Sequence, residues 1–312
     1  MISKYLTIWN EGFQLTIRDL EIFVEVCTQM SMSKAAQKLY ISPSSVSQSI
    51  SALENEYNTK LFERLSKKLY LTSNGKELLF HAKQLLYDLG QMNLKMRNLS
   101  YQGLVRIGVC TTIGHKLIYP ILEKFQNLYP SVNIQVEIGN SSYIEQKILS
   151  YDLDVAIIQM ESPCSELTYI DFLDDKLMLV CHPENPLAEQ TIKIKQLSLE
   201  PIIAREPGSR TQKMLQDIFD ESHIIPNVTW ICKSIDSIKE AVIHNKGIAL
   251  LSQYLMQDEL KNRKIAKINL EEYNFTRKFY VSYHKNKHLT EYIDNFIMLC
   301  STIKDENPLK VR

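Results

Sequence analysis

The stretch Ser33–Tyr57 constrains the fold more than any other part of the chain, because it predicts two short helices joined by a tight turn. The second helix opens on Ser42, a hydroxyl at the N-cap position, followed by Pro43 at the first helical position, where a missing N–H costs nothing. Apolar residues then recur every three or four positions, which places them on one helical face: Val46, Ile50, Leu53 and Tyr57. This pattern is typical of a helix-turn-helix.

The opposite face of the second helix carries small uncharged residues that donate and accept hydrogen bonds: Ser44, Ser45, Ser47, Gln48 and Ser51. Side chains of this kind can read base edges in a DNA major groove. The same face would also suit a solvated helix in an ordinary bundle, and the spacing alone does not separate the two interpretations.

Two flanking segments favour DNA binding. Thr16–Gln29 predicts an amphipathic helix able to cover the helix pair, and Asn58 tolerates the left-handed conformation that ends many helices. Lys60–Gly75 then predicts a short β-wing with apolar residues inward and basic residues outward: Arg64, Lys67 and Lys68. We expect these three to contact phosphates, while Ser47 and Gln48 face bases.

The whole run resembles the DNA-binding domain of LysR-type transcriptional regulators. The shared pattern is "DLEIFVEVC…MSKAAQKLYISPSSVSQSISALENEYNTKLFERLSKKLYLTSNGKELL", whose fixed spacing is far more specific than a bare helix-turn-helix. The resemblance implies a mostly α winged helix-turn-helix that binds double-stranded DNA. Asn58 stands where the family usually has Gly. Gln48 and Ser49 stand where Arg is frequent, so we expect base readout to depend less on charge than in many members.

Ser73–Ser100 predicts a long linker helix. Its apolar residues occupy heptad a and d positions over three heptads: Leu78, Ala82, Leu85, Leu89, Met92, Met96 and Leu99. A helix lying only on its own domain would show a wider face that drifts at period 3.6. The stripe therefore predicts a homodimer that reads an inverted repeat, and the resemblance implies the same pairing, with dimers that commonly assemble into tetramers.

After Tyr101–Gly103 the chain alternates predicted strands and helices, which favours parallel sheets covered by helices. Two such runs, joined by strands at Lys176–His182 and Arg277–His284, predict two α/β lobes with a crevice between them. This half resembles the LysR-family effector domain, of periplasmic-binding-protein type, in "VRIGVCTTIGHKLIYPILEKFQNLYP", "IGNSSYIEQKILSYDLDVAII", "AREPGSRTQKML" and "HNKGIALLSQYL". Ser252 replaces the usual Pro after "GIALL", and Arg210 stands where Gly is frequent.

We therefore expect four segments: an N-terminal extension (1–15), a winged helix-turn-helix domain (16–73), a dimerising linker helix (74–101) and an effector-binding domain of two lobes (102–312). Residues 1–15 precede the point where family members usually start. They lack the apolar core of a signal peptide, so we interpret them as a disordered extension or the product of an upstream start codon.

Polar residues follow the predicted strands and open the next helices, where hydroxyls and backbone N–H groups suit an anion: Thr111, Thr112, Asn140, Ser141, Gln159, Ser209, Arg210 and Thr211. Each hydroxyl alone could be only a helix cap, but four such loops at one crevice edge favour a ligand site. The resemblance places a small, usually anionic effector among these positions. Arg205 and Arg210 could add positive charge, or Arg210 could face solvent, and we interpret His115 as a surface residue.

Composition bears on the remaining classes of protein. The 36 basic and 36 acidic residues balance, which argues against a general nucleic-acid binder. No long apolar window predicts a membrane span, and without an export signal we expect a cytoplasmic protein with six reduced cysteines. No CxxC or His cluster indicates a metal or another cofactor. Cys164 and Cys181 could be tried as an oxidant-sensing pair, but no basic surroundings mark them.

A ligand-responsive regulator accounts for every segment. A solute-binding transport component would explain only the second half and needs an export signal. An enzyme is disfavoured, since we find no P-loop, G-x-S-x-G elbow, HExxH motif or credible pair of carboxylates. The stretches "TTIG" and "REPGS" are similar to those of regulators of sulfur or carbon assimilation, which points to such genes as targets.

Overall fold

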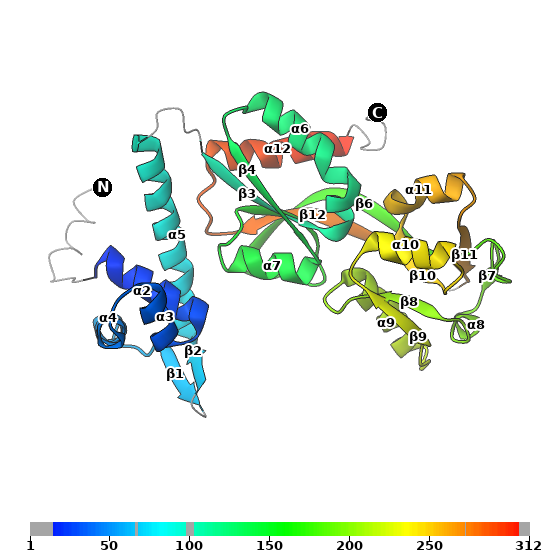
Figure 1. Ribbon diagram of the computed structural model, residues 1–312. Coiled ribbons are helices and arrows are strands. Elements are labelled where there is room, and N and C mark those ends of the chain that lie inside the picture. Colours follow the sequence, from blue (N-terminus) through cyan, green and yellow to red (C-terminus); the bar gives the residue numbers. More distant parts are fainter. Residues whose placement is uncertain (1–14, 66–67, 98–102, 272, 306–312) are drawn as a thin grey trace. The chain divides into compact units, whose positions relative to one another are not determined.

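The computed structural model describes residues 15–65, 68–97, 103–271 and 273–305 (Figure 1). The chain divides into two compact units, Met1–Tyr101 and Gln102–Arg312. The hydrophobic cores of each unit are built from that unit's own residues. Within the described ranges, no helix is long and apolar enough to cross a membrane.

The first unit contains the predicted helix-turn-helix and wing. Its elements are α2 (Ile17–Gln29), α3 (Met32–Lys38), α4 (Pro43–Glu56), β1 (Phe62–Leu65), β2 (Lys68–Leu71) and α5 (Ser73–Arg97). Ser42 caps α4 as predicted, because its hydroxyl accepts a hydrogen bond from the backbone N–H of Ser45 (3.1 Å). Asn58 has a φ of 45°, the left-handed conformation expected at this position. The strands β1 and β2 pair antiparallel and form the wing.

The apolar face of α4 packs into the core of the first unit. Val46, Ile50 and Leu53 are each at most 3% exposed, and they share this core with residues of α2 and α3. Tyr57, predicted to lie on the same face, is 40% exposed, because α4 ends at Glu56 and the backbone leaves helical geometry at Tyr57 itself.

Helix α5 starts by packing on its own unit. The hydroxyl of Thr72 accepts a hydrogen bond from the backbone N–H of Gly75 (3.0 Å), which caps the helix. Ala82 is only 2% exposed, and Leu78 packs against the same core. These two residues are therefore part of the intramolecular core, which corrects the expectation that the whole stripe faces a partner.

The remaining part of the stripe is open to solvent where the structure describes it. Leu85, Met92 and Met96 are 51%, 52% and 75% exposed, and Leu89 is half-buried. Leu99 lies outside the described residues. The helix thus changes role along its length, from a core element at its start to an exposed apolar face further on.

The second unit consists of two α/β lobes. The first lobe contains β3 (Leu104–Cys110), η1 (Ile113–Leu117), α6 (Ile118–Leu128), β4 (Asn133–Gly139), α7 (Ser141–Leu149), β5 (Val155–Gln159) and α12 (Glu291–Asp305). The second contains β7 (Thr191–Ile192), α8 (Ile194–Leu197), β8 (Ile202–Arg205), α9 (Arg210–Glu221), β9 (Val228–Cys232), α10 (Ile235–Ile243), β10 (Ala249–Ser252), α11 (Gln253–Lys261) and β11 (Ala266–Leu270). In Figure 1, α6 and α12 lie on one side of the first-lobe sheet and α7 on the other.

Two long strands, β6 (Leu167–Cys181) and β12 (Thr276–His284), connect the lobes. In the first lobe β3 pairs parallel with β4 and β5, and β12 pairs antiparallel with β5 and β6. The last part of β6 pairs with β10 and β11 of the second lobe, so β6 passes from one lobe into the other. This crossing holds the carboxyl ends of strands from both lobes near one another.

Some elements differ from those predicted. The strand predicted at Lys176–His182 is only the second-lobe end of β6, because its first-lobe half is interrupted by charged residues and lacks a continuous apolar run. The π-helical turn η1 begins at Ile113 and leads directly into α6, where an ordinary α-helix was expected. No sequence signal predicts β7, α8, α11 or β11.

Candidate functional site

The predicted DNA-reading face of α4 is exposed. Five uncharged residues lie on it, opposite the buried apolar residues of the helix: Ser44, Ser45, Ser47, Gln48 and Ser51. The hydroxyl of Ser42 lies 2.7 Å from that of Ser44 and 2.8 Å from that of Ser45. Arg64 and Lys68 on the wing are exposed as well, whereas Lys67 lies outside the described residues. This surface can offer hydrogen bonds from the helix and positive charge from the wing.

In the second unit, all eight residues predicted to hold a ligand line one small cavity of about 20 Å³. They are Thr111, Thr112, Asn140, Ser141, Gln159, Ser209, Arg210 and Thr211. Cys110, Arg205 and Arg277 complete the lining. A volume of this size holds little more than one water molecule.

The strand order explains why these loops converge. Thr111 follows β3, Asn140 follows β4, and Gln159 ends β5, so all three stand at the carboxyl edge of the first-lobe sheet. Arg205 ends β8 in the second lobe, and Ser209 precedes the first residue of α9. The cavity therefore lies where the loops of the two lobes meet.

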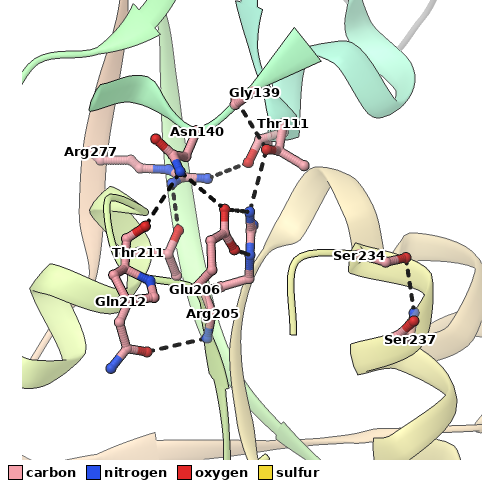
Figure 2. A network of polar contacts seen from close by, with 12 residues as sticks. Thr111, Gly139, Asn140, Arg205, Glu206, Thr211, Gln212, Ser234, Ser237 and Arg277 are labelled. Atoms are coloured by element: carbon pink, nitrogen blue, oxygen red, sulfur yellow. Dashed lines mark hydrogen bonds and ion pairs between the residues drawn. The ribbon is translucent and has the colours of Figure 1, made fainter. Parts of the chain in front are cut away.

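Arg277 of β12 is the residue that sequence reasoning missed. Its Nη1 donates to Gln159 Oε1 (3.0 Å) and to Thr211 Oγ1 (2.8 Å), and its Nη2 donates to Thr112 Oγ1 (3.0 Å). Its Nε donates to Asp175 Oδ2 (2.7 Å) in an ion pair whose side chains are 5% and 0% exposed. One buried guanidinium thus connects loops of both lobes, as Figure 2 shows for Thr211.

The carboxylate behind Arg277 is held by a second donor. The hydroxyl of Ser252 donates to Asp175 Oδ1 (2.8 Å), so both carboxylate oxygens are bonded. Burial raises the pKa of Asp175 above its ordinary value, although Arg277 and Ser252 counteract that rise. Ser252, which stands where the family usually has proline, therefore helps to position the carboxylate that pairs with Arg277.

Arg205 has its own carboxylate partner, its neighbour Glu206. Arg205 Nε lies 2.9 Å from Glu206 Oε2 and Nη2 lies 3.1 Å from Oε1, and both side chains are at most 10% exposed (Figure 2). Arg205 Nη2 also donates to Thr111 Oγ1 (3.3 Å) in the other lobe. From the same lobe, Asn140 Nδ2 donates to Glu206 Oε1 (3.5 Å) and to the Pro207 carbonyl (3.4 Å).

Arg210 connects the lobes by a further ion pair. Its Nη2 lies 2.8 Å from Glu145 Oε2 of α7, and its other terminal nitrogen contacts Glu161. The side chain is 14% exposed, so the alternative in which Arg210 faces solvent is wrong. His115, in contrast, is 31% exposed and lies 3.4 Å from Asp236, in keeping with a surface residue.

Helix capping explains only part of the polar set. Asn140 does cap α7, because its Oδ1 accepts from the backbone N–H of Tyr143 (3.0 Å). Thr112 and Ser209 make no capping bond with their side chains. Thr112 and Thr211 instead accept hydrogen bonds from Arg277. The hydroxyls of Thr112 and Thr211 therefore bind the buried guanidinium of Arg277.

Burial raises the thiol pKa of several cysteines. Burial raises the pKa of Cys27 to about 12 and that of Cys181 to about 11, and it also raises the pKa of Cys110 beside the cavity. Cys164 and Cys181 pack in different hydrophobic clusters. In the described part of the chain, no group of His, Cys, Asp and Glu has the arrangement of a metal site.

Two family models match the chain: the LysR substrate binding domain over residues 99–302, and the bacterial regulatory helix-turn-helix protein of the lysR family over residues 17–76. The HTH-type transcriptional regulator CysL of Bacillus subtilis (strain 168) is 30% identical over 262 residues, 83% of this chain and 88% of that protein. The RuBisCO operon transcriptional regulator of Allochromatium vinosum is 26% identical over 280 residues, 88% of this chain and 92% of that protein. The regulatory domain of Synechocystis PCC6803 CcmR in complex with 2-PG is similar in structure, with a TM-score of 0.61 and 26% identity over 66% of this chain and 99% of that one.

Proposed function

The chain belongs to the LysR family of bacterial transcriptional regulators, and on that premise we propose that a small anion bound between its two lobes switches its binding to DNA. The observation that carries the proposal is the position of Arg277. This buried guanidinium holds Thr112 and Gln159 of the first lobe together with Thr211 of the second. A ligand that exchanged with these contacts would change how the lobes are held together.

The donors around the cavity suit an anion. We assign its binding to the hydroxyls of Thr111, Thr112, Ser209 and Thr211, with help from Asn140, Ser141, Gln159 and Arg210. The cavity of about 20 Å³ has no room for a larger ligand unless the lobes separate. The CcmR domain, solved in complex with 2-PG, supports a small molecule as the ligand of such a domain.

The first unit would bind the DNA. We infer that α4 enters the major groove, where Ser47 and Gln48 read bases, while Arg64, Lys67 and Lys68 contact phosphates. The exposed apolar face of α5 would pair with that of a second copy, so that the dimer reads an inverted repeat. Dimers would then pair into a tetramer, as is common in the family.

The target genes we propose belong to sulfur or carbon assimilation. The "TTIG" and "REPGS" stretches support this assignment, since both lie at the cavity. The similarity to a RuBisCO operon regulator supports the carbon alternative.

Lobe movement would couple the ligand to DNA. The ligand can shift the balance between two lobe arrangements only by its difference in affinity for them, typically about 1–3 kcal/mol of coupling. The crossing strands β6 and β12 would serve as the hinge, because they are the elements that pass between the lobes.

Calorimetry of the full chain with sulfate, sulfite, bicarbonate and 2-PG tests the site. Thr112→Val keeps the side-chain shape and removes the hydroxyl, so we expect the affinity for the anion that binds to fall by roughly 10-fold or more. Thr191→Val, at the exposed first residue of strand β7, is the matched control and should leave the affinity unchanged. Equal affinity in wild type and Thr112→Val would remove Thr112 from the site, and the same result for Ser209→Ala would remove the site altogether.

A further inference from the structure

The arginines at the cavity are already matched by the chain's own carboxylates. Arg277 pairs with Asp175, Arg205 with Glu206, and Arg210 with Glu145 and Glu161. An anion that enters such a site meets no net positive charge from these pairs, because each cation already has a carboxylate within hydrogen-bonding distance. For the anion to gain an ionic partner, one of these pairs has to loosen.

Asp175 is the least suited to move. Its side chain is fully buried, and both oxygens are bonded, one to Arg277 and one to Ser252. It also lies on β6, a long strand paired along its length. The Arg277 pair is therefore a fixed part of the site.

Glu206 is placed differently. It belongs to the loop between β8 and α9, two residues before Gly208, whose φ of +86° is open to glycine at little cost. A Cβ at Gly208 would lie 3.0 Å from Asn140 Oδ1, so the loop packs directly against the other lobe. Glu206 itself accepts from Asn140 across this contact, and it bonds Arg205 with both carboxylate oxygens. Arg205 lines the cavity, and Glu206 does not.

We propose, resting on the anion site described above, that Glu206 is an internal counter-ion that competes with the bound anion for Arg205 and thereby limits the affinity of the site. The carboxylate of Glu206 would repel an anion bound near Arg205. Glu206 also occupies Nε and Nη2 of Arg205, the two donors that an oxyanion would bind in a bidentate contact. Glu206 thus sets the concentration at which the regulator responds.

The test is calorimetry of the full chain as wild type, Glu206→Gln and Glu206→Asp, titrated with sodium sulfate and with sodium bicarbonate. Glutamine keeps an acceptor for Arg205 but removes the charge, so we expect sulfate to bind about 10-fold more tightly or better. Aspartate keeps the charge and should give no such gain. Because Coulomb energy scales with the ligand's charge, the gain for divalent sulfate should be about the square of the gain for monovalent bicarbonate.

Glu166→Gln, at an exposed position of the second unit, controls for the change in net charge. An affinity that stays the same or falls in Glu206→Gln, while wild type binds, would overturn this inference and leave the anion site standing. An equal gain in Glu166→Gln would overturn it too. Absence of binding by wild type and every variant would instead refute the anion site itself. Thermal unfolding reports whether each variant folds, and if Glu206→Gln does not, Glu206→Ala carries the same expectation.

Discussion

At the scale of single residues, the second unit buries a carboxylate that no ligand is proposed to touch. Asp154 accepts from the backbone N–H of Arg106 (2.8 Å) and from its guanidinium (2.8 and 3.2 Å), and it lies 2.7 Å from Lys287 Nζ. Burial alone would raise the pKa of Asp154, but the hydrogen bonds and charges of Arg106 and Lys287 outweigh it, so the pKa is lowered. The carboxylate is therefore charged in the folded protein.

We predict that Asp154→Asn lowers the free energy of unfolding by about 3–5 kcal/mol at neutral pH, because the buried Lys287 and the partly buried Arg106 lose the carboxylate that they share. A lowered pKa stabilises the fold above the ordinary value of 3.8, and this contribution disappears as pH falls through the lowered pKa. Urea unfolding at several pH values should show the gap between variant and wild type narrowing on acidification. Asp171→Asn, in an exposed pair with Lys278, should have little effect, and an equal loss there would contradict the prediction.

The residues that line the cavity differ in how far the sequence predicts them. Eight polar residues were predictable because each follows a strand or opens a helix, and strand ends of one sheet meet at one edge. Arg277 was not, because it lies inside a strand and reaches Thr112 from 165 positions away along the chain. No local pattern marks a strand residue whose partners are brought to it only by the crossing of β6 and β12.

At the scale of elements, we propose that α4 and the wing have separable roles in DNA binding. We predict that Gln48→Ala loses roughly 1–3 kcal/mol of DNA-binding free energy and relaxes the preference at one position of each half-site. Lys68→Ala should weaken binding to all sequences alike and reduce the slope of affinity against salt by about 1. Band-shift titrations over a range of salt concentrations measure both effects.

Lys246→Ala, exposed in the second unit, is the matched control for loss of a positive charge and should leave both quantities unchanged. The opposite pattern, with Lys68→Ala altering sequence preference and Gln48→Ala only the salt dependence, would refute the proposed docking of α4.

Helix α4 was predictable to the residue at its start because two local signals coincide there, a capping hydroxyl and a proline at the first helical position. The elements that escaped prediction do not have both signals after a separating loop. The sequence around η1 gives no sign of the wider helical turn, and α11 follows β10 directly, with Ser252 both ending the strand and capping the helix. Neighbouring elements that share a residue leave no loop by which to separate them.

At the scale of the whole molecule, we propose that the exposed part of α5 forms the dimer interface. We predict that Met92→Lys weakens the dimer, because an unpaired charge in an apolar interface costs several kcal/mol. Sedimentation velocity over a concentration series measures the shift toward monomer. Asn93→Lys, on an adjacent exposed position, adds the same charge outside the stripe and should leave the dimer intact. An unchanged oligomer in Met92→Lys would exclude the stripe as the dimer interface.

The choice of Met92 follows from what the sequence could not reveal about this helix. The heptad pattern is continuous from Leu78 onward, yet Ala82 belongs to the core of its own unit. A periodic apolar stripe specifies which face of a helix is covered, but not by what. Intramolecular and intermolecular partners produce the same pattern, and only the packing of α5 against α2 separates them.

The hydrophobic core clusters of the two units share no residues, which allows the units to evolve separately. Among the residues that the structure describes, every core cluster draws its members from one side of the division at Tyr101 and Gln102. A substitution that repacks one core changes residues that no core cluster of the other unit shares, so we expect free-energy changes on the two sides to add. The DNA preference of the first unit and the ligand preference of the second can then change independently during evolution. Recombination near that division can join the first unit of one gene to the second unit of another while each core keeps all of its residues.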